Sequence, residues 1–231
     1  MKKNVAIIQV RTNSSRFPKK SIKKIDTHSL IEWVVKRVKK SKKLDLVVIA
    51  TSKRKSDKIF GKIAKKLKVK IFYGDENNVL SRYCLAAKKF KAQNIIRVCA
   101  DNPFISHNFI DNLIYFFNKN KCDLAFNHRP LKKFNYRCIN GLGAEIVSRR
   151  ILEEMNISTK SNKDKEHVTR YLYNNYKYLK KPVPVKKIFQ INKKLDIDKK
   201  EDFLKIKKFI KKNNLNINSN DYDIIKALKN E

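Results

Sequence analysis

The chain has 231 residues, of which 42% are apolar, and it carries a formal net charge of +35. This length favours one α/β domain, and the apolar content supports a substantial core, which excludes a disordered chain. The sequence contains no apolar run of about 18 residues, no signal-peptide pattern and no C-x-x-C pair among its four cysteines. We therefore expect a cytoplasmic protein with free thiols, no membrane span and no zinc site.

The positive charge has two interpretations. The basic residues are mostly lysines, and they are spread along the whole chain, for example over residues 62–70 and 205–212. Codon bias of an AT-rich genome gives this pattern, and charge runs are usually solvated faces. A basic nucleic-acid-binding protein is the alternative, but no helix-turn-helix, zinc-finger or aromatic RNA-sheet signature occurs. We expect no specific nucleic-acid partner.

Apolar runs alternate with amphipathic segments along the chain. Predicted strands cover residues 5–10, 46–50, 69–72, 94–98, 123–126 and 144–148, with a late strand end at 195–198. Predicted helices cover residues 30–38, 59–67, 79–90, 109–117, 166–173, 203–210 and 222–228. The pattern predicts a single α/β domain over residues 1–231, a three-layer α/β/α structure with a mostly parallel, Rossmann-like sheet. An irregular excursion is expected around residues 127–187.

Polar segments follow the predicted strands at residues 11–20, 51–52, 74–78 and 101–102. In doubly wound sheets, ligands bind beyond the carboxyl ends of the strands. We therefore expect these four segments to gather at one edge of the sheet.

The segment 11–20, Arg-Thr-Asn-Ser-Ser-Arg-Phe-Pro-Lys-Lys, follows the first buried strand. Arg11 and Arg16 offer forked donors to phosphate oxygens, and Lys20 offers a point charge. The hydroxyls of Ser14 and Ser15 and successive backbone N–H groups can bind the remaining oxygens. A phosphate-binding loop is favoured over a solvated basic loop, although no Walker motif is present.

This loop resembles the R-x-G-S-x-R-x-P-x-K signature of the CMP-sugar synthetase superfamily, which includes acylneuraminate cytidylyltransferases. The branch that it resembles most is that of the spore-coat polysaccharide (SpsF-like) cytidylyltransferases. Further segments match in the expected order, at residues 50–52, 74–83, 101–105, 141–145, 166–169 and 198–202. The resemblance runs from about Val5 to Asp202.

The resemblance implies a nucleotide-diphospho-sugar transferase fold and a Mg²⁺-dependent nucleotidyltransferase. Such an enzyme transfers CMP from CTP to a sugar, a precursor of surface polysaccharide or glycoconjugate, and releases pyrophosphate. CTP and the sugar are the expected partners, and the relatives suggest a homodimer.

Three positions depart from the family pattern. Asn13 and Lys19 stand where the family has glycines, and Gly143 replaces an aspartate of a G-L-D segment. Asparagine tolerates left-handed backbone angles, so the loop can keep its shape. These departures leave open a non-catalytic relative or one that uses another nucleotide, such as UTP.

Asp101 and Asp198 are the candidate metal ligands. Each follows a predicted strand, and two carboxylates from different strands can share a hard cation with phosphate oxygens. The resemblance implies Mg²⁺ at this place. The alternative is a pair of turn or N-cap aspartates.

The remaining candidate residues belong to the nucleotide and sugar sites. The candidate catalytic residues are Arg11, Arg16, Lys20 and Asp101, and the nucleotide-binding set adds Asn13, Ser14, Ser15, Thr51, Ser52 and Arg82. Thr51 and Ser52 are expected to hydrogen-bond the base. The sugar-binding candidates are Arg97, Glu145, Glu166 and His167. For Arg97, a structural ion pair and a ligand contact are equally favoured. No general base is assigned.

Overall fold

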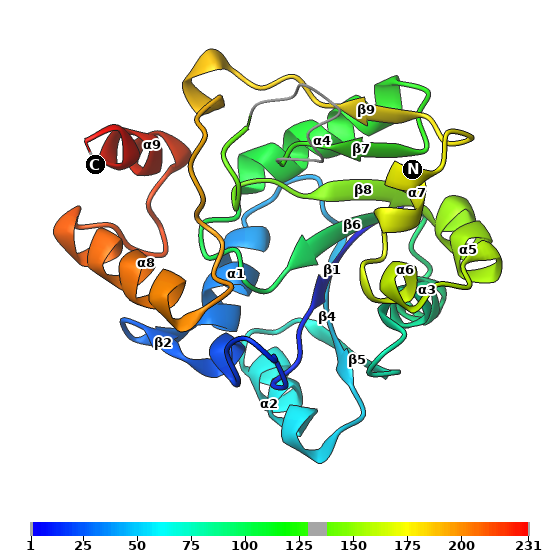
Figure 1. Cartoon of the computed structure of the whole chain (residues 1–231), viewed down its shortest axis with the longest axis horizontal. Helices are drawn as coiled ribbons and strands as arrows, with labels where there is room; N and C mark the ends of the chain where they lie inside the picture. Colours follow the sequence, from blue (N-terminus) through cyan, green and yellow to red (C-terminus); the bar gives the residue numbers. More distant parts are fainter. Residues whose placement is uncertain (1, 129–137, 231) are drawn as a thin grey trace.

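A mostly parallel sheet of seven strands forms the centre of the structure, a computed structural model that describes residues 2–128 and 138–230 (Figure 1). The strands are β1 (Asn4–Gln9), β4 (Leu46–Ser52), β5 (Lys70–Gly74), β6 (Asn94–Cys99), β7 (Leu124–Phe126), β8 (Glu145–Ser148) and β9 (Lys180–Pro182). Their order across the sheet is β5-β4-β1-β6-β8-β7-β9. Only β8 pairs antiparallel to its neighbours. A separate hairpin joins β2 (Lys24–Ile25) to β3 (His28–Ser29).

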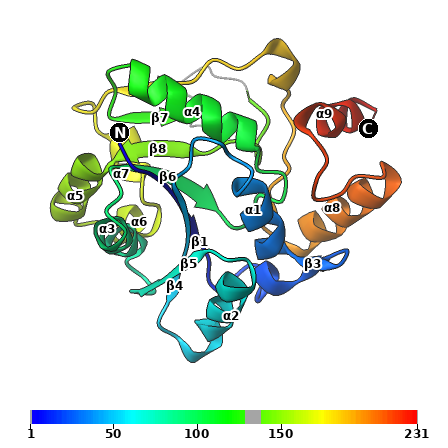
Figure 2. The same ribbon diagram turned by 180° about the vertical axis from the view of Figure 1, so that it is seen from behind.

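Helices cover both faces of the sheet. They are α1 (Leu30–Val38), α2 (Ile59–Lys66), α3 (Val79–Lys89), α4 (His107–Lys119), α5 (Arg149–Ser158), α6 (Asn162–Glu166), α7 (Arg170–Asn174), α8 (Lys200–Lys212) and α9 (Asp221–Lys229). Figures 1 and 2 show α1 and α2 on one side of the sheet and α3 and α5 on the other. Within the described residues, no helix is long and apolar enough to cross a membrane.

The apolar strands are explained by burial on both faces. In β1, Ala6 and Ile8 pack in the core beneath α1, α2 and α4, whereas Val5 and Ile7 pack in the core beneath α3, α5 and α7. A strand buried on both faces has apolar residues throughout and no alternation. The predicted three-layer α/β/α fold with a mostly parallel sheet is confirmed.

A third apolar cluster joins α8 and α9 to α1 and to the β2–β3 hairpin. The ring of Phe104 lies 6.2 Å from that of Trp33 and 5.9 Å from that of Phe209. The ring of Phe17, from the basic loop, lies 5.7 Å from that of Phe203 at the start of α8. The C-terminal helices are thereby packed against the loop that follows β1.

The second half of the chain differs from the sequence expectation. The stretch 127–187, where an irregular excursion was expected, contains the expected strand as β8 and also α5, α6, α7 and β9 in its described part. The helix expected at 166–173 is split into α6 and α7, because the backbone turns at Val168 with φ of 27°. Residues 195–198 form no strand and instead run beside the end of β6, where the N–H of Ile197 donates to the carbonyl of Asp101 at 2.9 Å.

Candidate active site

A cavity of about 250 Å³ opens at the carboxyl ends of β1 and β6. Because β1 lies between β4 and β6, the strand order reverses there, which is where ligands bind in open α/β sheets. The residues proposed from the sequence that line it are Arg11, Ser14, Arg16, Lys20, Arg82, Arg97, Asp101, Glu166 and His167. The fold therefore brings segments from four parts of the chain to one cavity.

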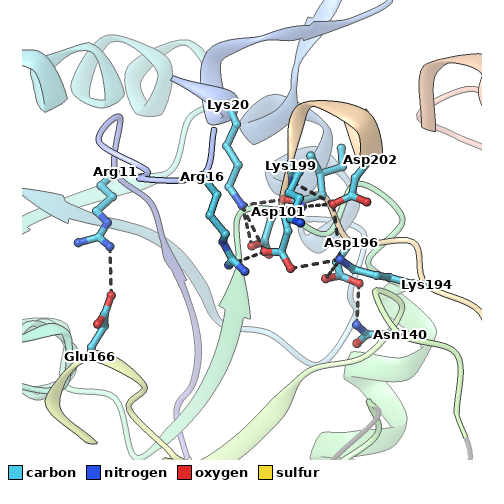
Figure 3. A network of polar contacts seen from close by, with 12 residues as sticks. Arg11, Arg16, Lys20, Asp101, Asn140, Glu166, Lys194, Asp196, Lys199 and Asp202 are labelled. Atoms are coloured by element: carbon cyan, nitrogen blue, oxygen red, sulfur yellow. Dashed lines mark hydrogen bonds and ion pairs between the residues drawn. The ribbon is translucent and has the colours of Figure 1, made fainter. Parts of the chain in front are cut away.

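Each of three cations in the basic loop contacts a carboxylate from another segment (Figure 3). Arg11 Nη2 lies 3.1 Å from Glu166 Oε1 of α6, and Arg16 Nη2 lies 2.8 Å from Asp198 Oδ1. Lys20, at the start of the 3-10 helix η1 (Lys20–Ile22), places Nζ 3.1 Å from Asp101 Oδ2. These side chains are 15–61% exposed, so a ligand can reach them.

Lys20 also shows how close the two candidate metal ligands lie. Its Nζ is 3.1 Å from Asp101 Oδ2 and 4.0 Å from Asp198 Oδ1, so the two carboxylates are near enough to share one cation. In residues 2–128 and 138–230, no set of three or more His, Cys, Asp or Glu side chains is arranged to hold a metal. Mg²⁺ commonly takes one or two carboxylates together with substrate phosphates, and this pair fits that requirement.

Asp196 joins this cluster, although the sequence reasoning did not select it. Lys194 Nζ lies 3.5 Å from Asp196 and 3.1 Å from Asp198 (Figure 3). Burial raises the pKa of Asp196, and the nearby Asp101 and Asp198 carboxylates act in the same direction. The signal in the sequence was the Asp-Ile-Asp spacing, which places both aspartates on the same side of an extended segment.

Glu145 does not face the cavity, which corrects its assignment as a sugar ligand. Its buried carboxylate accepts hydrogen bonds from Arg97 Nη1 at 2.8 Å, Thr169 Oγ1 at 2.7 Å and the Tyr173 hydroxyl at 2.9 Å. His128 Nε2 lies 2.9 Å from Glu145 Oε1. Burial favours the protonated form, but Arg97 and His128 outweigh it and hold the pKa of Glu145 well below its usual value. Glu145 therefore fixes Arg97.

Three buried polar atoms in the cavity lining have no hydrogen-bond partner within the described chain. They are Gln9 Oε1, Arg82 Nε and Arg97 Nε. Arg82 is 1% exposed and donates from Nη1 to the carbonyl of Asp75 at 2.9 Å. Buried polar atoms in native proteins are almost always paired, so these three indicate a ligand. Sequence reasoning missed Gln9, whose signal is a polar side chain at the end of an apolar strand.

The other predicted nucleotide contacts differ from expectation. Thr51 and Ser52 are fully buried, and both hydroxyls donate to Asp57 Oδ2 rather than to a base, which corrects their assignment. Asn13 and Ser15 are exposed and lie outside the cavity lining.

The structure shows why glycine suits two of the three positions that depart from the family pattern, position 19, where the family has it, and position 143, where this chain has it. Lys19 has φ of 58° and ψ of 18°, so it adopts the left-handed conformation that suits glycine. A Cβ at Gly143 would lie 2.0 Å from the carbonyl oxygen of Asn127, so no aspartate fits there. Asn13 is not among the positive-φ residues of the described chain.

Comparison with known proteins decides the family. A family model described as Cytidylyltransferase matches residues 5–224. The chain belongs to the cytidylyltransferase family. This confirms the resemblance first drawn from the loop and the segments that follow it.

Two relatives and one solved structure illustrate the similarity. The chain is 30% identical over 174 residues to the spore coat polysaccharide biosynthesis protein SpsF of Bacillus subtilis, and the aligned region covers 73% of this chain and 69% of that protein. It is 32% identical over 143 residues to a 3-deoxy-manno-octulosonate cytidylyltransferase of Fusobacterium nucleatum. That aligned region covers 57% of this chain and 54% of that protein. A cytidylyltransferase structure from Leptospira borgpetersenii superposes with a TM-score of 0.90 at 26% identity, over 100% of this chain and 95% of that one.

Proposed function

We propose that this protein transfers CMP from CTP to a sugar and releases pyrophosphate. The observation that carries the proposal is the set of three loop cations, Arg11, Arg16 and Lys20, whose partly exposed ion pairs surround one cavity. A triphosphate can replace the carboxylates as their partner, because charged phosphate oxygens make the same charge-assisted bonds. Membership of the cytidylyltransferase family supports CTP as the donor.

In this reaction a sugar hydroxyl oxygen attacks the α-phosphorus of CTP. A new oxygen–phosphorus bond forms, the bond to the oxygen that bridges to the β-phosphorus breaks, and pyrophosphate leaves with that electron pair. The hydroxyl proton passes to water, since no residue is assigned as a base. The chain's own contribution is to place the two groups and to neutralise the charge that develops on the phosphate oxygens.

Asp101 and Asp198 would hold Mg²⁺, with Asp196 beside them. The support is that both carboxylates lie beside the same ammonium group, Lys20 Nζ, at 3.1 Å and 4.0 Å. When bound, the ion would neutralise charge on the phosphate oxygens.

An acidic sugar is the acceptor that this cavity favours. Arg82 Nε and Arg97 Nε are buried donors for which the described chain supplies no acceptor, and Arg82 makes no ion pair with a carboxylate within the described residues. A sugar carboxylate offers two such oxygens, and a buried cation is stabilised by an anionic partner. One relative is named for an acid of this kind, 3-deoxy-manno-octulosonate.

Pyrophosphate release tests the proposal. The four nucleoside triphosphates should be assayed against matched acidic and neutral sugars, with Mg²⁺ and with excess chelator. We expect release with CTP and an acidic sugar, and none in chelator. Release with a neutral sugar alone would contradict the acidic acceptor. Full turnover in chelator would contradict the metal assignment, and release with UTP but not CTP would contradict the donor.

A further inference from the structure

A buried carboxylate lies directly behind the basic loop and is held by four hydrogen bonds. Asp57, in the 3-10 helix η2 (Lys55–Lys58), is 1% exposed. Its Oδ1 accepts from the N–H of Thr12 at 2.8 Å and from the Thr12 hydroxyl at 2.6 Å. Its Oδ2 accepts from the hydroxyls of Ser52 at 2.6 Å and Thr51 at 3.3 Å. Both oxygens are therefore used, and neither faces the cavity.

The carboxylate is ionised at neutral pH. Burial acts to raise the pKa of Asp57, but the hydrogen bonds from Ser52 and Thr12 outweigh burial and lower it. An ionised carboxylate accepts hydrogen bonds from O–H and N–H donors more strongly than a neutral oxygen does. Asp57 can thus hold Thr12 firmly from behind the loop.

Thr12 is the residue that joins the two ends of the loop. Its carbonyl accepts the N–H of Lys19 at 2.7 Å, and the hydroxyl of Ser21 donates to the carbonyl of Arg11 at 3.3 Å. Arg11 directly precedes Thr12, and Lys20 directly follows Lys19. The position of Thr12 therefore sets the separation of Arg11 and Lys20, the first and last cations of the loop.

The loop needs such an anchor, because its like charges repel one another and residues 11–20 include four cations. A loop that is already ordered loses less entropy when it binds a ligand. We propose that Asp57 is a positioning residue that fixes Thr12 and thereby holds Arg11 and Lys20 at the spacing needed for the triphosphate. This inference rests on the proposed nucleotide site.

Two substitutions of Asp57 test whether its hydrogen bonds to Thr12 hold the loop. Asp57→Asn keeps one carbonyl oxygen for the Thr12 N–H, and its amide can donate to the Ser52 and Thr51 hydroxyls, which can turn to accept. Asp57→Ala removes every acceptor and leaves the buried Thr12 N–H without a partner. The asparagine variant should therefore recover part of what the alanine variant loses.

Asp111 offers a matched control. Its carboxylate accepts from the hydroxyl of Ser41 and from the N–H groups of Lys42 and Lys43, both at 3.1 Å, and so holds a different loop away from the cavity. Asp111→Ala removes a loop-holding aspartate of the same kind. It should leave nucleotide binding unchanged.

The experiment is calorimetric titration of the full chain with CTP and Mg²⁺, alongside the melting temperature of each variant. We expect Asp57→Ala to weaken CTP binding by about tenfold to a hundredfold, because the side chains of Arg11 and Lys20 must then be ordered when the nucleotide binds. Asp57→Asn should lie between wild type and Asp57→Ala, because it keeps a hydrogen-bond acceptor for Thr12 but lacks the negative charge. A folded Asp57→Ala variant with wild-type affinity would overturn the inference, and so would an asparagine variant as weak as the alanine one.

Smaller changes keep the inference testable if Asp57→Ala does not fold. Thr12→Val and Ser52→Ala each remove one hydroxyl donor to Asp57, and each should weaken CTP binding by about twofold to tenfold. Unchanged CTP affinity in both would overturn the role of Asp57. If the wild-type chain binds no nucleoside triphosphate at all, the proposed function fails and the inference fails with it. If the wild type binds CTP and the variants match it, the inference fails alone.

Discussion

An arginine–glutamate ion pair lies at the edge of the cavity and another at its floor, and the two differ in how far they are exposed to solvent. At the edge, Arg11 and Glu166 meet at 3.1 Å with side chains 34% and 49% exposed. At the floor, Arg97 and Glu145 meet at 2.8 Å with side chains 15% and 3% exposed, and Thr169 and Tyr173 add hydrogen bonds to Glu145. An exposed pair contributes little net free energy, whereas breaking a buried pair is costly. The edge pairs can therefore exchange for a ligand, and the floor pair holds its arginine in place.

The largest effect should come from breaking the floor pair. Glu145→Ala leaves Arg97 as a buried charge without its carboxylate, and we expect the free energy of unfolding to fall by about 3–5 kcal/mol. Urea denaturation followed by circular dichroism measures this loss. A decrease below about 1 kcal/mol, as for a surface pair, would show that the floor is not fixed in the way described.

Removing a cation at the edge should affect catalysis rather than stability. Lys20→Met removes the charge nearest to Asp101, and we expect kcat/KM for CTP to fall by about 10²–10³, as for other groups that stabilise developing charge. Lys24→Met is the matched control, because Lys24 is an exposed lysine of β2 a few residues further along. Pyrophosphate release measures both variants. Equal losses in the two would point to bulk charge rather than to a site.

The floor pair also predicts how acid affects stability. The folded-state pKa of Glu145 lies below its usual value, so its contribution is present at neutral pH and is lost as pH falls below the ordinary value of 4.5. Wild type should lose about 1.4 kcal/mol per pH unit from this group in that range. Glu145→Gln lacks the titration, so the gap in unfolding free energy between the two proteins should narrow with acid. A gap that stays constant from neutral pH to pH 3 would refute the assignment.

The smallest effect should come from the edge pair itself. Glu166→Ala removes the partner of Arg11, and we expect the free energy of unfolding to change by less than about 1 kcal/mol. CTP affinity should stay the same or rise by about threefold at most, because Arg11 no longer has to leave a carboxylate. Calorimetric titration decides this, and a tenfold loss of affinity would mean that Glu166 binds the ligand directly.

Sequence patterns were sufficient for most of the sheet and for the edge of the site. Parallel strands such as β1 and β4 are buried on both faces, so their apolar runs stand out. Of the four polar segments expected to gather, 11–20 and 101–102 line the cavity, whereas 51–52 and 74–78 do not. The loop of residues 11–20 was found because two arginines, two serines and a terminal lysine follow such a strand. Asp101 and Asp198 were found because each follows an apolar segment.

The floor of the site was harder to predict, because its residues are defined by partners far away in the chain. Glu145 looked like a ligand for sugar hydroxyls, yet it contacts Arg97 from 48 positions away. Thr51 and Ser52 looked like contacts for the base, but their hydroxyls bind Asp57, which no local pattern distinguishes from a surface aspartate. The segment 195–198 looked like a strand end, although it forms no strand and its apolar residues pack in the cluster with α8 and α9.

The central claim is that the loop cations exchange carboxylates for the phosphates of CTP, and Arg16 tests it most directly. Its guanidinium is 61% exposed and contacts Asp198, so Arg16→Ala should leave the fold intact. Calorimetric titration of wild type and Arg16→Ala with CTP and Mg²⁺ is the measurement. We predict affinity at least about tenfold weaker in the variant, the value of one charge-assisted contact to phosphate, with an unchanged melting temperature. Equal affinity in the two proteins would contradict the account.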